Sequence, residues 1–132
     1  GGNTVKSMIC DLSLDYPDFL IASSEWFAFV PAKEYFDEPG DHADELETSV
    51  MMHYHPELVN LDEAGNGDYK KFTSQMLNEK VAWIPRNWQK VSQDTGIGNP
   101  KKASAEKGKK YAEAVVAKYA LLFEELVHKE LY

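Results

Sequence analysis

The longest regular pattern in the chain lies near its C-terminal end. Over residues 103–131, apolar side chains recur at intervals of three and four, the spacing that places them on one face of an α-helix. The stripe consists of Tyr111, Val115, Val116, Tyr119, Leu122, Phe123, Leu126 and Val127. Because the stripe is wide, we expect this helix to pack against a sheet or a partner subunit. We interpret the stripe as core and not as a cofactor-binding face.

The N-terminal part of the chain predicts a helix followed by a buried strand. Val5, Met8, Ile9 and Leu12 recur at helical spacing, and Pro17 follows them, so the helix should end before this proline. The short apolar run at residues 19–22 predicts a strand buried on both faces. A helix followed by such a strand is the second half of a βαβ unit. The sequence therefore predicts an α/β fold whose leading strand would precede residue 1.

The middle of the chain carries weaker patterns. We predict short strands at residues 58–61, 80–84 and 88–91, the last two forming a hairpin across residues 85–87. Residues 69–80 show a weak helical pattern, and the glycines of residues 62–68 and 96–100 predict loops.

Composition limits the class of protein. A length of 132 residues with 43% hydrophobic residues fits a single globular domain, and the net charge of -8 opposes binding to nucleic acid or to an anionic membrane surface. Cys10 is the only cysteine, which excludes an intrachain disulfide and a cysteine-based zinc site. No apolar run reaches the roughly 18 residues of a membrane span. We therefore expect a cytoplasmic protein.

Residues 41–49, Asp-His-Ala-Asp-Glu-Leu-Glu-Thr-Ser, combine a histidine with several carboxylates. If Asp41 or a neighbour caps a helix over residues 43–54, His42 and Glu45 lie side by side at its N-terminal end. Imidazole transfers protons near neutral pH and carboxylates bind divalent metals, so this pair suits metal-assisted hydrolysis. Acidic residues also favour helix N-termini without any chemistry. Spacing alone therefore leaves a plain helix cap as the simpler interpretation.

The other histidines and the glycine-rich loop are weaker candidates. His53 and His55 flank one residue at the end of the predicted helix and point about 200° apart, which favours surface roles over joint metal binding. His128 lies near the end of the last helix, where a cation suits the helix dipole. Gly96 and Gly98 lack the third glycine or the Gly-Lys-Ser/Thr ending of nucleotide-binding loops.

Three patches of sequence match one known pattern in the right order. Residues 42–49 match His-Ala-Gly-Glu-x-Glu-Thr-Ser except that Asp44 stands where glycine is usual. Residues 96–100, with Ala-Ser-Ala-Glu-Lys-Gly at 103–108, match a second patch in which Asn99 replaces the preferred aspartate. Gly1, Gly2 and Asn3 match the tail of Asn-Gly-His-Gly-Gly-Asn. With these patches, the chain resembles the creatininase (creatinine amidohydrolase) family of metal-dependent amidohydrolases.

The resemblance implies a three-layer α/β/α sandwich with a mainly parallel sheet and a dinuclear metal site, holding zinc and a second ion such as manganese. Most of the family's metal ligands come from an N-terminal half that these residues do not include. Residues 1–132 are thus expected to be the C-terminal half of a single creatininase-like domain, separated by proteolysis, gene division or choice of segment. We expect the N-terminal half as a partner, a homo-oligomer, and no activity from this chain alone.

The resemblance also implies roles for individual residues. His42 would be the catalytic proton shuttle that protonates the leaving nitrogen, and Glu45 would be a metal ligand. Gly2 and Asn3 would line the substrate site.

Two further residues have implied supporting roles. Asp41 would orient His42 or the substrate, and Glu47 would support the ligands or the helix.

The implied reaction is hydrolysis of a C–N amide or cyclic amide bond in a small molecule. Creatinine, a formamide and a small peptide stay open as substrates, because creatininases proper carry a tryptophan shortly before the histidine and this chain has Glu-Pro-Gly at 38–40. A non-catalytic structural or assembly subunit with the same fold is the alternative.

Overall fold

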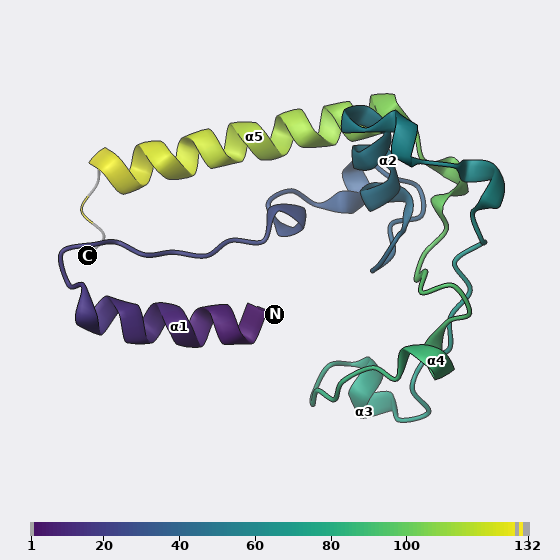
Figure 1. The fold of residues 1–132 in the computed structure, drawn as a ribbon, viewed down its shortest axis with the longest axis horizontal. Coiled ribbons are helices and arrows are strands. Elements are labelled where there is room, and N and C mark those ends of the chain that lie inside the picture. The colour runs from purple at the N-terminus through teal and green to yellow at the C-terminus, as the bar shows by residue number, and fades with distance from the viewer. Residues whose placement is uncertain (1, 129, 131–132) are drawn as a thin grey trace.

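The computed structural model of this chain describes residues 2–128 and 130. Its main elements are helices: α1 (Gly2–Asp15), α2 (Glu45–Tyr54), α3 (Gln75–Asn78), α4 (Trp88–Val91) and α5 (Ala105–His128). Single-turn 3-10 helices lie between them: η1 (Trp26–Ala28), η2 (Ala32–Glu34), η3 (Pro56–Leu58), η4 (Leu61–Glu63) and η5 (Pro100–Lys102). Figure 1 shows α2 against the first turns of α5, the segment with α3 and α4 extending away from them, and α1 apart.

The predicted α/β fold with a mainly parallel sheet is wrong for this chain. Within the described residues there is no strand, and the ladder contacts are two isolated antiparallel bridges, His42 to Ile97 and Tyr69 to Ser92. Residues 19–22 lack helical structure but lie on the surface, with Phe19 68% exposed. A strand forms only when its N–H and C=O groups pair with a neighbouring strand, and no described segment pairs with this run. A run of apolar residues indicates a segment suited to burial, but it does not indicate that a neighbouring strand is present to pair with it.

The other predicted strands are also wrong, because short apolar runs do not distinguish strand from helical turn. Residues 58–61 fall in and between η3 and η4, where Pro56 is suited to the first position of a turn. Residues 88–91 form α4, and residues 80–84 are irregular. The weak pattern over residues 69–80 yields only α3, whose first turn is capped by Ser74 accepting from the Leu77 N–H.

The three long helices are confirmed, with shifted ends. α1 ends at Asp15, before Pro17. α2 begins at Glu45, because Asp44 is its cap: one carboxylate oxygen accepts from the Glu47 N–H at 2.9 Å and the other from the Gly40 N–H at 2.5 Å. α5 is described as far as His128, and the predicted extension to residue 131 lies outside the described residues.

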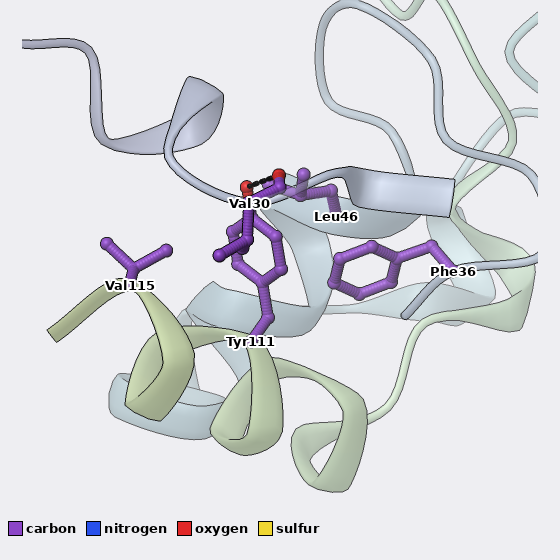
Figure 2. Packing of buried hydrophobic residues seen from close by; sticks show 5 residues of the cluster. All are labelled: Val30, Phe36, Leu46, Tyr111 and Val115. Carbon is purple, nitrogen blue, oxygen red and sulfur yellow. Dashed lines mark hydrogen bonds between the residues drawn. The ribbon is translucent and has the colours of Figure 1, made fainter. Parts of the chain in front are cut away.

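The core lies between α5, the start of α2 and residues 26–36 (Figure 2). Its buried members are Val30, Phe36, Leu46, Tyr111 and Val115. The Tyr111 side chain is fully buried, and its hydroxyl is 3.0 Å from the Phe27 carbonyl oxygen and 3.4 Å from that of Val30. A buried hydroxyl needs such an acceptor, so these contacts hold residues 26–30 on α5.

Small residues let α2 and α5 approach closely. A Cβ added at Gly108 would lie 1.9 Å from the backbone oxygen of Ser49. Ser49 is fully buried, and its hydroxyl accepts from the Ser104 N–H at 3.1 Å. This crossing brings the patch at residues 41–49 against the patch at 103–108, so the two motifs belong to one structural unit.

The chain leaves much apolar surface uncovered. Its accessible surface is 10216 Å², whereas a compact 15.0 kDa protein exposes about 7,000 Å². No residue of α1 is buried, and Val116, Phe123 and Val127 on the C-terminal part of α5 are each more than half exposed. The predicted stripe on α5 is thus covered only in its first turns. None of the described helices has the length and hydropathy needed to cross a membrane.

Candidate functional site

The patch at residues 41–49 meets the glycine-rich loop at residues 96–100. The N–H groups of Asp41 and His42 donate to the Ile97 oxygen at 2.7 and 3.2 Å, and the Ile97 N–H donates to the His42 oxygen at 2.8 Å. Gly98 has a φ of +119° and packs so tightly that an added Cβ would lie 2.7 Å from the Gly40 Cα. Only glycine tolerates both conditions. The loop therefore fixes the backbone that presents His42.

His42 lies just before α2, and its neighbour is Glu47. The His42 Nδ1 is 3.7 Å from a Glu47 carboxylate oxygen, and that oxygen accepts from the Ala43 N–H at 2.6 Å. The side chains of His42 and Glu47 are 48% and 40% exposed. The expected pairing of His42 with Glu45 is wrong, because α2 begins two residues later than predicted and Ala43 turns the chain with a φ of +49°.

Glu45 instead points into the contact between α2 and α5. Its side chain is fully buried; one oxygen lies 2.5 Å from the Lys107 Nζ, and the other accepts from the Glu38 N–H at 2.6 Å. The Lys107 Nζ also lies 2.8 Å from Asp37. Hydrogen bonds to Asp37 and then Glu45 raise the pKa of Lys107. Both carboxylate oxygens of Glu45 therefore have partners within the chain.

Asp41 is held by Arg86. The guanidinium donates to both carboxylate oxygens, with the Nη1 to Oδ1 contact at 2.9 Å. This hydrogen bonding lowers the pKa of Asp41 and raises that of Arg86. Arg86 also lies over the Trp88 ring, 5.4 Å from its centroid, and the Trp88 ring lies 5.3 Å from the His42 ring. Asp41 thus positions the aromatic neighbour of His42.

Two cavities lie near the His42 and Glu47 pair, and Glu47 lines one of them. One, of about 970 Å³, is lined by Gly40, Asp41 and Trp88 together with other residues of the 69–91 segment. The other, of about 460 Å³, is lined by Ala43, Glu47, Asp94 and the surrounding loops. Hydrogen bonds from the Gly96 N–H and the Ser92 hydroxyl lower the pKa of Asp94. Glu47 therefore borders the smaller space, and Asp41 and Trp88, the neighbours of His42, border the larger one.

The described residues do not gather a complete metal site. No group of three or more His, Cys, Asp or Glu side chains suited to a metal occurs in the part of the chain that the structure describes. The exposed Glu47 carboxylate beside His42 fits one edge of a site. Gly2 and Asn3 lie on the exposed first turn of α1 and line neither cavity, and Gly1 is outside the described residues.

Sequence reasoning missed Arg86, Trp88 and Lys107. Arg86 is the only arginine in the chain, and Trp88 follows it by two residues, which was an available signal. Lys107 lies within the third motif patch. Their side-chain partners Asp41, His42, Glu45 and Asp37 are between 45 and 70 residues away, so no local pattern indicated the contacts.

Comparisons with known proteins find the same family that the sequence motifs resemble. A family model described as creatininase, creatinine amidohydrolase, matches residues 1–123. The chain is similar over its whole length to a crystal structure of a protein named as a proposed creatinine amidohydrolase from Bacteroides fragilis NCTC 9343, with 59% identity and a TM-score of 0.92. It covers 53% of that protein's chain, about half its length. Among curated proteins, none matches.

Proposed function

The chain belongs to the creatininase family, as its motifs predicted, and from this membership we propose that it forms part of a metal-dependent amidohydrolase. The proposed reaction is hydrolysis of a C–N amide or cyclic amide bond in a small molecule. The observation that carries the proposal is the exposed His42 and Glu47 pair, whose members lie 3.7 Å apart; Glu47 lines one cavity, and Asp41 and Trp88, the neighbours of His42, line another.

His42 has the surroundings that a proton-transfer residue needs. A carboxylate facing Nδ1 favours the tautomer with its proton on that nitrogen, which leaves Nε2 to exchange a proton with the substrate. The Glu47 carboxylate accepts a hydrogen bond from the Ala43 N–H. The Trp88 ring packs against the His42 ring and restricts its movement. We propose that His42 delivers the proton to the leaving nitrogen as the C–N bond breaks.

The proposed metal is zinc, with a second ion such as manganese, and its remaining ligands come from outside this chain. When bound, such a metal lowers the pKa of a water molecule. Glu45 is the ligand that the family pattern predicts, and its binding to metal would require Lys107 to release one oxygen. Glu47 needs no such change, because its carboxylate is exposed beside His42. Glu45 and Glu47 are therefore alternative candidates for the metal ligand.

The proposed partner is the remainder of a creatininase-like domain, without which this chain is inactive. The excess of about 3,000 Å² over a compact protein of this mass supports this, since obligate interfaces reach that size. The apolar residues left exposed on α1 and α5 are suited to such burial. The homo-oligomer and the cytoplasmic location stay predictions.

The test is to co-express the chain with the part of the Bacteroides fragilis protein that it does not span. Bound metal and hydrolysis of creatinine, a formylaminopyrimidine and a dipeptide are then measured. His42→Ala should lower hydrolysis at least about 100-fold and keep the metal. His55→Ala is the matched control, because His55 also faces a glutamate, Glu57 at 3.2 Å, on an exposed surface. Equal effects of the two variants would contradict the role of His42.

Metal content of Glu45→Gln and Glu47→Gln in the same complex identifies the ligand. A ligand variant should lose metal, while full metal content in both would remove this patch from the metal site. A complex that binds no metal and hydrolyses none of the amides would favour the alternative, a structural or assembly subunit. The burial of Glu45, whose two carboxylate oxygens both have partners within the chain, is the observation that favours this second candidate.

A further inference from the structure

Positive charge is concentrated in one segment of an acidic chain. Residues 69–91 carry five cationic side chains and one carboxylate, a net charge of +4, whereas the whole chain has a net charge of -8. This is the segment that includes α3 and α4 and extends away from the α2 and α5 crossing (Figure 1). A local charge opposite to that of the whole chain attracts anions to one place.

The cationic side chains gather around the 970 Å³ cavity beside His42. Lys70, Lys71, Lys80 and Arg86 all line it. Arg86 is neutralised by Asp41, but the three lysines have no ion-pair partner in the described part of the chain. Lys80 also interacts with Asp41 and helps to lower its pKa, but the three ammonium groups together exceed the charge of that carboxylate and favour an anionic occupant over a neutral one.

The same cavity has aromatic walls. Tyr69, Phe72, Trp83 and Trp88 line it, with Ile84 and Leu77 adding aliphatic surface. Flat aromatic side chains provide faces on which a planar ring can stack. Trp88 also contacts the His42 ring, so a ligand stacked in the cavity would lie next to the proton-transfer residue.

We propose that this cavity binds the substrate, and that the substrate is a planar ring compound bearing an amide and an anionic group. The lysines would hold the anionic group, the aromatic walls would hold the ring, and the amide would face His42. This rests on the proposed function only in treating the cavity as part of the reaction site. Creatinine has no separate anionic group and would leave the lysines unpaired, so it is a poor occupant.

The test uses four probes with the full 132-residue chain. Hippurate has an aromatic ring, an amide and a carboxylate, and N-benzoylglycinamide is its neutral counterpart. N-acetylglycine keeps the charge without the ring, and phenyl phosphate replaces the carboxylate with a phosphate. Affinities come from calorimetric titration at low salt, and shifts of the Trp83 and Trp88 indole N–H signals locate the site.

Hippurate should bind at least about tenfold more tightly than its neutral amide and than N-acetylglycine, and added salt should reduce the first difference. Tighter binding of phenyl phosphate than of hippurate would identify the anionic group of the substrate as a phosphate. Tighter binding of hippurate would identify it as a carboxylate. The triple variant Lys70→Gln, Lys71→Gln, Lys80→Gln should lose this advantage and keep its affinity for the neutral amide. Lys109→Gln, Lys110→Gln, Lys118→Gln on α5 is the control with the same change of charge.

Equal binding of hippurate and its neutral amide, equal losses in the two triple variants, or no binding of any probe would overturn the proposal. These measurements need neither metal nor turnover. Their failure would leave the amidohydrolase proposal in place, and failure of hydrolysis in the co-expressed complex would leave the anion-binding cavity in place.

Discussion

The buried carboxylate of Glu45 is hydrogen-bonded to one cation, Lys107, and this makes Lys107→Met an informative variant. The substitution removes the ammonium group and keeps a side chain of similar length. Glu45 is fully buried, so its carboxylate would retain only the Glu38 N–H as a partner. Removing one member of a buried ion pair costs about 3–5 kcal/mol. Because the Lys107 side chain is 30% exposed and water reaches it, we expect the lower end, about 3 kcal/mol.

This loss converts to a fall in Tm of about 10 °C for a chain of this size. Lys102→Met is the matched control, because Lys102 pairs with Glu38 at 2.8 Å on the surface, where an ion pair contributes little. The control should leave the Tm nearly unchanged. Thermal unfolding followed by circular dichroism at 222 nm, with urea unfolding for the free energies, measures both variants.

Glu45→Gln completes a double-mutant cycle. If the pair acts as a unit, the double variant should be less destabilised than the sum of the single variants by about 2 kcal/mol. Additive losses would show that Glu45 and Lys107 stabilise the fold independently. A Lys107→Met loss no larger than that of Lys102→Met would show that Glu45 does not need its cation. Either result would refute the assignment of this pair as the link between α2 and α5.

Three further predictions concern the fold around the site. Gly108→Ala should cost about 2–3 kcal/mol in urea unfolding, because the new Cβ meets the Ser49 backbone oxygen at 1.9 Å; a gain in stability, as at an exposed helical glycine, would contradict the close crossing. Tyr111→Phe should cost about 1 kcal/mol by leaving two carbonyl groups without their donor, and an unchanged Tm would argue against those hydrogen bonds. Arg86 lowers the pKa of Asp41, so this pair should stabilise the chain above the ordinary carboxyl pKa of 3.8 and lose its effect as the pH falls below it. Stability measured between pH 5 and pH 2 should therefore fall less steeply in Arg86→Gln than in the unmodified chain.

Local sequence determined the long helices and the family. The apolar spacing in α1 and α5, Pro17 after α1, and Asp44 before α2 are all features of neighbouring residues, and they act through backbone geometry within one or two turns. The motif patches likewise predicted the creatininase family, which the family model over residues 1–123 confirms. The roles of His42, Glu45 and the other predicted site residues stay predictions.

Tertiary structure decided what depends on a distant partner. The apolar run at residues 19–22 could not become a strand without a neighbouring strand to pair with. In residues 41–49, the sequence by itself determined that a histidine and several carboxylates precede a helix. In the folded chain α2 begins at Glu45, and Glu47 lies beside His42. The crossing of α5 over α2 places Lys107 beside Glu45, and the two form an ion pair. Because His42 lies before the helix, its side-chain neighbour is set by the bend at Ala43 and the bridge to Ile97, and not by the spacing of residues along a helix.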